Sequence, residues 1–338
     1  MTSREIIRRV INHDNPPRIG WDFLDPRYQD ILHVHAVKLA RPGTEQYEKW
    51  GEYPELQARV PGFHGELCMD GMGNILGRLN GITKGECVRG VISGDWSELN
   101  GYKFPKVSRE TVESLKARKL REQDKYVMTY LPGLFSVLRD MRLMPNALMD
   151  VVTEPEQVAA FLERVLQMQA EAVEAAAEAG ADGAMICDDW GMQSAPLISP
   201  GAFRSLFMPA YARIAEHCRR RGVDFILHSC GMVAPLVPSM LEAGIKVFQF
   251  DQPEMSGVDF WAEAYGAKAA FYCPVDIQKV MPTGDRAVIE AAAKRMADSF
   301  KKAGGSLIAK DYPTWWEIGI PDEWSAWARD AIVANSQM

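Results

Sequence analysis

Residues 223–231, with the sequence Val-Asp-Phe-Ile-Leu-His-Ser-Cys-Gly, join a short apolar run to a polar turn. The apolar run predicts a buried strand, and a helical pattern follows the turn after Gly231. A strand that ends in ligand-type residues and continues into a helix is typical of a catalytic loop on a parallel α/β barrel. Within the turn, His228 and Cys230 stand one residue apart, so their imidazole and thiolate can face one cation. Cysteine is also a common buried residue, so the pair alone leaves a purely structural role open.

The alternation of apolar runs and helical patterns repeats through the second half of the chain. Strands are predicted at residues 183–187, 223–227, 246–250, 269–272 and 306–309. Helical patterns separate them, at about 154–179, 200–220, 233–243 and 285–303. Consecutive βα units form a parallel sheet, and at least five of them favour a closed (β/α)8 barrel, the TIM-barrel fold, over an open sheet. Further strand candidates in the first half are residues 18–21 and 126–130.

The whole chain, residues 1–338, is expected to form a single barrel domain. A chain of 338 residues is long for one domain unless that domain is an α/β barrel. Two alternating segments around Asn80-Gly81 predict an N-terminal β-hairpin excursion from the barrel, at about residues 66–95.

The bulk composition argues against several kinds of partner. The formal net charge of -7 disfavours nucleic acid. No apolar run approaches the roughly 20 residues of a membrane span, so we expect no membrane insertion. The N-terminal segment is typical of a short amphipathic helix capped near Ser3 rather than of a signal peptide. The six cysteines lack the dense spacing of a disulfide framework, so the cytoplasm is the expected location.

Polar and reactive side chains follow each of the five strands predicted in the second half of the chain. They are Asp188, Asp189, Trp190, His228, Cys230, Asp251, Gln252, Cys273, Asp276, Lys310, Asp311 and Tyr312. Because the carboxyl ends of parallel barrel strands surround one mouth, these residues are predicted to share one face of the molecule. Barrel active sites collect their residues in this way, so the mouth is the candidate active site.

A metal ion is the first expectation for this mouth. Imidazole and thiolate ligands together favour Zn²⁺. We predict His228 and Cys230 as ligands from one loop and Cys273 as a second thiolate from another. Cys273 precedes Pro274, so a buried position at the end of its strand is the structural alternative.

Three acids are candidates for a further metal ligand or for the catalytic acid. They are Asp188, Asp189 and Asp311. The adjacent pair Asp188 and Asp189 can equally cap the loop that follows or pair with an arginine. The histidines at 33 and 35, spaced by two, lie in a poorly patterned segment and are interpreted as ordinary surface or core residues.

The predicted loops are rich in aromatic residues. The residues that we expect to contact the substrate are Trp21, Trp190, Tyr312 and Trp315. Their rings could form the walls of a pocket for a flat organic ligand, whereas packing in the core or at the barrel rim is the alternative.

Several longer motifs, taken together, extend over most of the chain. They are Met69-Asp-Gly-Met-Gly-Asn74, Tyr102-Lys-Phe-Pro105, Leu131-Pro-Gly-Leu-Phe135, Ala179-Gly-Ala-Asp182, Cys187-Asp-Asp-Trp190, Ile198-Ser-Pro-Gly-Ala-Phe203, Pro209-Ala-Tyr211 and His228-Ser-Cys-Gly231. In this combination the sequence resembles the uroporphyrinogen decarboxylase superfamily, which implies a (β/α)8 barrel. The tetrapyrrole decarboxylases of that superfamily carry an arginine-rich motif for substrate carboxylates, but the corresponding segment here is Gly20-Trp-Asp-Phe23.

The His-x-Cys motif is instead similar to that of the corrinoid-dependent methyltransferases, in which the histidine and the cysteine bind zinc. Their third ligand is a cysteine after the last barrel strand. Here that strand is followed by Lys310-Asp-Tyr-Pro313, which contains no cysteine, so Cys273 or Asp311 is the substitute candidate.

The resemblance implies a zinc-dependent methyltransferase of the O-demethylation type. Its substrate would be a small methyl donor, with an aryl methyl ether favoured by the aromatic loops. The methyl acceptor would be a Co(I) cobamide on a separate corrinoid protein, because no cobamide-holding motif is present in this chain. A homodimer is left open. The alternatives are a uroporphyrinogen-type decarboxylase of an organic acid and a non-catalytic binding protein.

Overall fold

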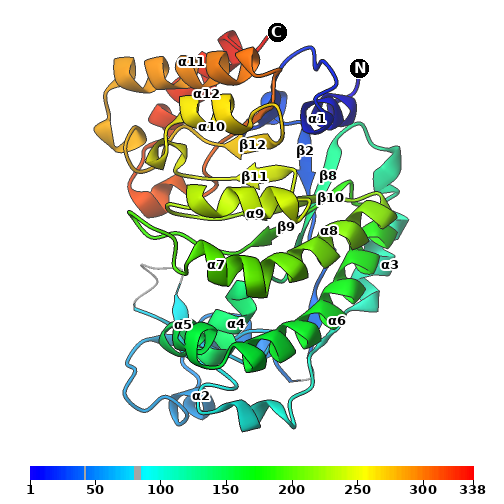
Figure 1. The fold of residues 1–338 in the computed structure, drawn as a ribbon, viewed down its shortest axis with the longest axis vertical. Helices are drawn as coiled ribbons and strands as arrows, with labels where there is room; N and C mark the ends of the chain where they lie inside the picture. The colour runs from blue at the N-terminus through cyan, green and yellow to red at the C-terminus, as the bar shows by residue number, and fades with distance from the viewer. Residues whose placement is uncertain (42, 80–84) are drawn as a thin grey trace.

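The computed structural model describes residues 1–41, 43–79 and 85–338. Its centre is a sheet of eight parallel strands in the order β1-β13-β12-β11-β10-β9-β8-β2 (Figure 1). The strands are β1 (Gly20–Asp22), β2 (Ile31–His33), β8 (Tyr126–Leu131), β9 (Gly183–Cys187), β10 (Asp224–His228), β11 (Val247–Gln249), β12 (Ala270–Cys273) and β13 (Leu307–Lys310). The predicted barrel is confirmed, and each strand predicted in the second half is present within a few residues of its expected bounds.

The two outermost strands of this sheet are consecutive in the chain, which brings the sheet round into a nearly closed barrel. A connection of only eight residues, 23–30, joins β1 to β2. Backbone hydrogen bonds run from the Asp30 N–H to the Trp21 carbonyl (2.7 Å) and from the Phe23 N–H to the Tyr28 carbonyl (3.0 Å). Strand β2 was not predicted, because three residues are too few to show an alternating pattern.

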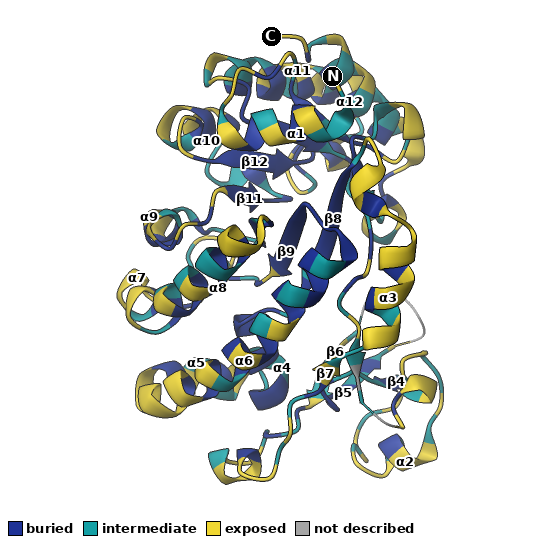
Figure 2. Cartoon of the chain, turned by 90° about the vertical axis from the view of Figure 1, so that its right-hand side faces the viewer, coloured by how far each residue is buried: buried dark blue, intermediate teal, exposed yellow. Residues whose placement is uncertain are grey.

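Helices lie around the barrel and beside the segment that connects β2 to β8 (Figure 1). They are α1 (Ser3–Asn12), α2 (Pro54–Gln57), α3 (Arg109–Ala117), α4 (Phe135–Arg142), α5 (Met144–Thr153), α6 (Pro155–Ala179), α7 (Pro200–Ala202), α8 (Met208–Arg221), α9 (Val237–Glu242), α10 (Val258–Tyr265), α11 (Arg286–Lys302) and α12 (Asp322–Ala334). Figure 2 shows the barrel strands as buried and the outward faces of the surrounding helices as exposed. No described helix combines the length and the apolar character that crossing a bilayer requires.

Alternation along each strand divides the core into two parts. Side chains that point into the barrel form one cluster, which includes Met128, Met185, Ile226 and Tyr272. Their neighbours in the chain point outward and join a larger cluster between the strands and the helices. Since successive residues of a strand face opposite sides, a shift of one position decides whether a side chain can reach the barrel interior.

Helix α1 closes the amino-terminal end of the barrel. Its apolar face places Ile7, Val10 and Ile11 in the interior cluster. Thr2 caps the helix by accepting a hydrogen bond from the Glu5 N–H, and the Glu5 carboxylate accepts one from the Thr2 N–H. With this end filled, the open space of the barrel lies at the carboxyl ends of the strands.

The segment between β2 and β8 leaves the barrel and forms two small antiparallel sheets. The strands are β3 (Leu39–Ala40) with β7 (Lys106–Val107), and β4 (Glu66–Met69), β5 (Ile75–Arg78) and β6 (Glu86–Arg89) in one three-stranded sheet. The excursion therefore has three strands over the expected range rather than a simple hairpin. The expected Asn80-Gly81 turn lies outside the described residues. In Figure 1 this part lies at the end of the molecule opposite the two termini.

Candidate metal and active site

A cavity of about 540 Å³ occupies the carboxyl-terminal mouth of the barrel. The residues that line it are Asp22, Phe23, Leu24, Gln29, His33, Tyr130, Met185, Cys187, Asp189, His228, Cys230, Gln249, Asp251, Tyr272, Lys310, Asp311, Tyr312 and Pro313. Most of them lie at or just after the ends of barrel strands. The mouth predicted as the candidate active site is therefore a real concavity of the size that holds a small organic molecule.

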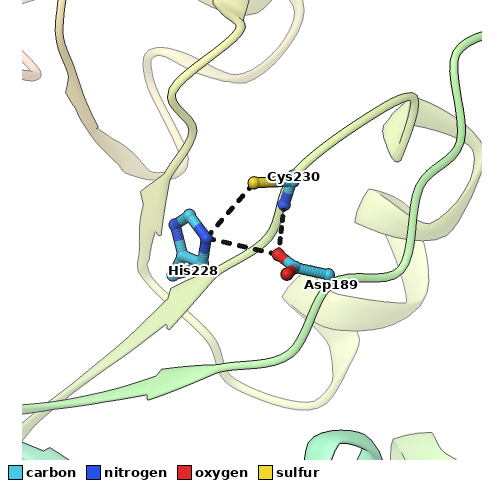
Figure 3. A group of neighbouring side chains, drawn as sticks. All are labelled: Asp189, His228 and Cys230. Carbon is cyan, nitrogen blue, oxygen red and sulfur yellow. Dashed lines mark hydrogen bonds and ion pairs between the residues drawn. The ribbon is translucent and has the colours of Figure 1, made fainter. Parts of the chain in front are cut away.

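Three side chains converge in this cavity and form a candidate metal-binding group (Figure 3). His228 Nε2 lies 3.5 Å from Cys230 Sγ and 3.3 Å from Asp189 Oδ1. Tetrahedral Zn²⁺ with ordinary bond lengths places nitrogen and sulfur ligands about 3.5 Å apart, and nitrogen and oxygen ligands about 3.3 Å apart. The two distances from His228 Nε2 thus match tetrahedral zinc, and all three donor atoms lie within 4.8 Å of one another. Three protein ligands leave a fourth position for substrate, as catalytic zinc sites do.

Neighbouring strands and a close backbone approach hold this group together. Strands β9 and β10 are adjacent, and Asp189 follows the end of β9 just as Cys230 follows the end of β10. The Cys230 N–H donates to Asp189 Oδ1 (2.9 Å), and the Gly191 N–H donates to the Cys230 carbonyl (3.1 Å). A Cβ on Gly191 or Gly231 would collide with the backbone of the other loop, and Gly231 has a φ of 80°. Glycine at these two positions therefore permits the packing that brings the carboxylate to the thiol.

A chain of hydrogen bonds behind His228 sets its orientation. His228 Nδ1 is hydrogen-bonded to Gln249 Oε1, and Gln249 Nε2 donates to Asp251 Oδ1 (2.7 Å). Lys310 Nζ donates to the same carboxylate oxygen (3.1 Å). Because the Gln249 amide nitrogen is engaged by Asp251, its oxygen faces the imidazole and selects the tautomer with the proton on Nδ1. That tautomer leaves the Nε2 lone pair free to bind a metal ion.

The electrostatics of the group match a site that holds a cation. Burial alone would lower the pKa of His228, but hydrogen bonds to Asp189 and Cys230 outweigh it and raise that pKa well above its ordinary value. Burial would raise the pKa of Asp189, and the same bond to His228 lowers it below its ordinary value. Burial raises the pKa of the Cys230 thiol, with His228 acting in the opposite direction. In the metal-free protein a proton on His228 therefore occupies the place between the donor atoms, and metal binding would displace it.

Replacing Gln249 by leucine should weaken zinc binding by about 10–100-fold, because His228 would lose the acceptor that fixes its tautomer. Competition with a chromophoric chelator measures the affinity. The exposed Gln278→Leu is the matched control, since among the described residues the Gln278 side chain is hydrogen-bonded to Gln193 alone. Equal affinities of the two variants would contradict the assigned role of Gln249.

Cys273, predicted as a second thiolate ligand, does not lie near this group. Its side chain is fully buried in the outer cluster, whereas Tyr272 before it points into the barrel. Burial raises the pKa of the Cys273 thiol to about 12, which disfavours a thiolate there. The alternation of β12 is the physical reason that the residue faces the helices rather than the cavity.

The three predicted acids have different surroundings. Asp189 belongs to the metal group. Asp188 is fully buried and accepts hydrogen bonds from the Leu134 N–H (2.9 Å), the Ser136 N–H (2.7 Å) and the Tyr211 hydroxyl (2.5 Å). Asp311 lines the cavity but accepts hydrogen bonds from the Leu24 N–H (2.8 Å) and the Ser325 hydroxyl (2.7 Å), and burial raises its pKa. Asp188 therefore holds the fold, and Asp311 anchors two segments of the rim.

The structure brings only one of the four predicted aromatic residues to the cavity, namely Tyr312. Trp190 is fully buried, stacks on Phe135 with ring centroids 4.3 Å apart, and lies outside the barrel because Asp189 before it faces the cavity. Trp315 is buried in the same outer cluster. Trp21 packs outward against the guanidinium of Arg18, 3.5 Å from its ring. Alternation in and just after β1 and β9 explains the outward positions of Trp21 and Trp190, whereas Trp315 lies beyond β13 in a short 3-10 helix.

Among the cavity residues that were not identified from the sequence as site residues, four are polar side chains that contact one another. They are Asp22, His33, Tyr130 and Tyr272, and they form a second hydrogen-bonded cluster. His33 lies in the unpredicted strand β2, so its pattern gave no reason to place it in the barrel. The alternation of β8 and β12 could have shown that Tyr130 and Tyr272 face inward.

The mouth of this barrel thus contains a candidate metal-binding group inside a cavity large enough for a small organic molecule. The family model of uroporphyrinogen decarboxylase (URO-D) matches residues 104–309, which is more than half of the chain. The protein belongs to the uroporphyrinogen decarboxylase family.

Two similar proteins come from Methanosarcina mazei. Methylated-thiol--coenzyme M methyltransferase is 26% identical over 160 residues, which are 47% of this chain and 41% of that protein. The similarity therefore spans less than half of that relative's length. A solved structure of a methyltransferase has a TM-score of 0.65 at 15% identity, covering 99% of this chain and 98% of that one. At this identity the structural match supports the fold alone.

Proposed function

We propose that this protein is a methyltransferase that moves a methyl group from a small methyl donor to a Co(I) corrinoid on a separate protein. The single observation that carries the proposal is the group Asp189, His228 and Cys230, which has the spacing of a zinc site inside the barrel-mouth cavity. The similarity to a methyltransferase that handles methylated thiols supports the same class of reaction.

The three donors would hold Zn²⁺, with Asp189, after β9, as the third ligand; in the proteins that this chain resembles, the third ligand is a second cysteine, after the last barrel strand. A bound zinc ion supplies Lewis acidity, which stabilises an alkoxide, phenolate or thiolate as it leaves the methyl group. The protein's own contribution is to orient the ligands through Gln249 and to keep the donor atoms at tetrahedral spacing.

The charges of the cavity favour a neutral methyl donor over a carboxylated substrate. Among the lining residues described, Lys310 is the one lysine or arginine, and it is paired with Asp251 (3.1 Å). The lining also contains Asp22, Asp189 and Asp311. Apart from the open position on the zinc ion, an anionic substrate would find no unpaired lysine or arginine there to offset the desolvation of its carboxylate. This argues against the decarboxylase alternative, whose substrate is an organic acid.

An aryl methyl ether is the donor that we favour. The tryptophans that first suggested it lie outside the cavity, but four other aromatic side chains line it: Phe23, Tyr130, Tyr272 and Tyr312. The volume of about 540 Å³ accommodates one substituted benzene ring. The aromatic ring of such a donor would make apolar contact with these side chains, in stacked or edge-to-face geometry.

The rim of the mouth suits a protein partner that carries the cobamide. Large apolar side chains are exposed on the loops after β1, β9 and β13, namely Leu24, Met192 and Trp316. Exposed apolar residues around a cavity are typical of interaction surfaces. We infer that the corrinoid protein docks over this rim and delivers the nucleophile into the cavity from outside.

The proposal is tested by mixing the zinc-loaded protein with a Co(I) corrinoid and a panel of anisole, methoxyphenols, methanol, methanethiol and methylated amines. Methyl transfer from one donor class is expected to convert the Co(I) spectrum into that of methyl-Co(III). A second arm offers carboxylated substrates without corrinoid. Release of carbon dioxide there, together with an unchanged Co(I) spectrum for every donor, would replace the methyltransferase by the decarboxylase.

A further inference from the structure

A second polar cluster lies on the cavity wall formed by β1, β2, β8 and β12. The Tyr130 hydroxyl is 2.9 Å from His33 Nδ1, and His33 Nε2 is 2.8 Å from Asp22 Oδ2. The Tyr272 hydroxyl donates to the same Asp22 oxygen. All four side chains line the mouth cavity, although they come from four different strands.

The hydrogen bonds of this cluster define the direction in which a proton can move. Asp22 is a carboxylate and accepts, so His33 Nε2 carries a proton toward it. The other ring nitrogen, Nδ1, then either accepts from the Tyr130 hydroxyl or, in the imidazolium, donates to its oxygen. When His33 is an imidazolium, its Nδ1–H donates to the Tyr130 oxygen. The hydroxyl proton of Tyr130 then no longer bonds to His33 and can be donated to a molecule in the cavity.

Tyr130 is suited to donate a proton rather than to attack as a phenolate. Burial, together with the charge of Asp22, raises its pKa to about 12, so the hydroxyl remains protonated. In the sheet, Tyr130 of β8 pairs with Met185 of β9, and Cys187 of β9 pairs with His228 of β10. The Tyr130 side chain and the candidate metal-binding group therefore line the same cavity, and one strand, β9, separates β8 from β10.

The predicted acids of the cavity are engaged elsewhere. Asp311 accepts from Leu24 and Ser325, and Asp251 is paired with Lys310. Asp188 lies outside the cavity and Asp189 is in the metal group. A leaving group that departs as an oxyanion still needs a proton to become a stable product.

We propose that Tyr130 is the acid that protonates the leaving oxygen of the methyl donor, with His33 and Asp22 as the residues that position it and resupply its proton. This inference rests on the proposed function, because it assigns a step of that reaction. It places the acid on the wall that sequence analysis had left without a role.

The C–O bond of the donor breaks, and its electron pair stays on oxygen. The methyl carbon forms its new bond with an electron pair from the Co(I) corrinoid. The oxygen takes the hydroxyl proton of Tyr130, Tyr130 takes a proton from the imidazolium of His33, and His33 is reprotonated by one proton from the solvent at the cavity mouth. The net change consumes the methyl donor, the Co(I) corrinoid and one solvent proton, and it gives a phenol and the methylated corrinoid.

The test is the dependence of the rate on the leaving group. Tyr130→Phe, which keeps the ring, is expected to lower kcat/KM for anisole by about 100-fold or more, the usual scale of general acid catalysis. For 4-nitroanisole, whose phenolate leaves without help, the loss should be less than about 10-fold. His33→Ala should show the same pattern, and the solvent deuterium isotope effect should fall toward unity in both variants.

His35→Ala is the matched control. The His35 ring stacks on Tyr130 with centroids 5.5 Å apart, but it is exposed and lines a separate groove. Its kinetics should stay close to those of the unchanged protein for both donors. Equal losses for anisole and 4-nitroanisole in Tyr130→Phe would show a structural role and overturn the proposal.

A second measurement needs no turnover and so separates this inference from the proposed function. 4-Nitrophenol reports its own protonation by its absorbance. The unchanged protein and His35→Ala should keep a larger share of the bound probe protonated than His33→Ala and Tyr130→Phe. Identical spectra in all four proteins overturn the assignment of the acid. A protein that shows this difference but methylates no corrinoid with any donor retains the acid and loses the proposed function.

Discussion

Zinc content is expected to fall from about one ion per chain to nearly none when Cys230 is replaced by serine or His228 by alanine. Each substitution removes one of three converging donors, and a serine hydroxyl is a poor ligand for a soft metal at neutral pH. Methyl transfer should fall by about 1000-fold or more, because Lewis-acid stabilisation of a leaving group is worth several kcal/mol. Elemental analysis of the purified variants gives the stoichiometry, and the methyl-Co(III) spectrum gives the rate.

Two further variants test which other residue is a zinc ligand. Asp189→Ala should also lose most of its zinc, because its carboxylate is the third donor. Cys273→Ala should keep its zinc, since that thiol is buried outside the barrel. Full zinc in Cys230→Ser and His228→Ala would end the metal assignment, whereas loss of zinc in Cys273→Ala would restore Cys273 as a ligand.

Asp188→Ala should be the most destabilising of the site-region substitutions, with a loss of about 3 kcal/mol or more in the free energy of unfolding. It would leave the Leu134 N–H, the Ser136 N–H and the Tyr211 hydroxyl without their acceptor in a fully buried position. Each unsatisfied buried donor costs about 1–3 kcal/mol, and these add only in part. Chemical denaturation in the presence of a metal chelator measures the change.

The neighbouring Asp189→Ala is the matched comparison for stability. The Asp189 side chain is 43% exposed, so the Cys230 N–H that it accepts from can turn to water, and the loss should stay within about 1 kcal/mol without metal. The two substitutions would then have different effects: Asp188→Ala would lower the free energy of unfolding, and Asp189→Ala would lower metal binding. A larger loss for Asp189→Ala than for Asp188→Ala would contradict the positions assigned to them.

Local patterns in the sequence were enough to predict the barrel and the His-x-Cys turn of the candidate metal site. Apolar runs such as 223–227 show their strands directly, and the helical patterns between them show the order of the βα units. That order also predicts that His228 and Cys230 lie at the mouth of the barrel, because all parallel strands of a barrel end on one face. The structure brings these two residues together as the sequence predicted.

The sequence shows less clearly which strand-end side chains face the cavity and which face the helices. Asp188 and Asp189 are adjacent and chemically alike, yet one holds the helices and the other faces the cavity. Cys273 and Trp190 follow the same rule on the outer side. A one-residue error in where a strand ends exchanges the two faces, which is why several predicted site residues proved to be structural.

By itself the sequence determined the order of strands and helices and the His-x-Cys turn, since both depend on neighbours within a few residues. Only the tertiary structure decided that Asp189 joins the turn and that Gln249 orients it. It also decided that His33 meets both Asp22 and Tyr130, although Tyr130 lies 97 residues away. These contacts join residues on different strands, and their distances are set by strand order, register and curvature of the whole barrel, which no short stretch of sequence encodes.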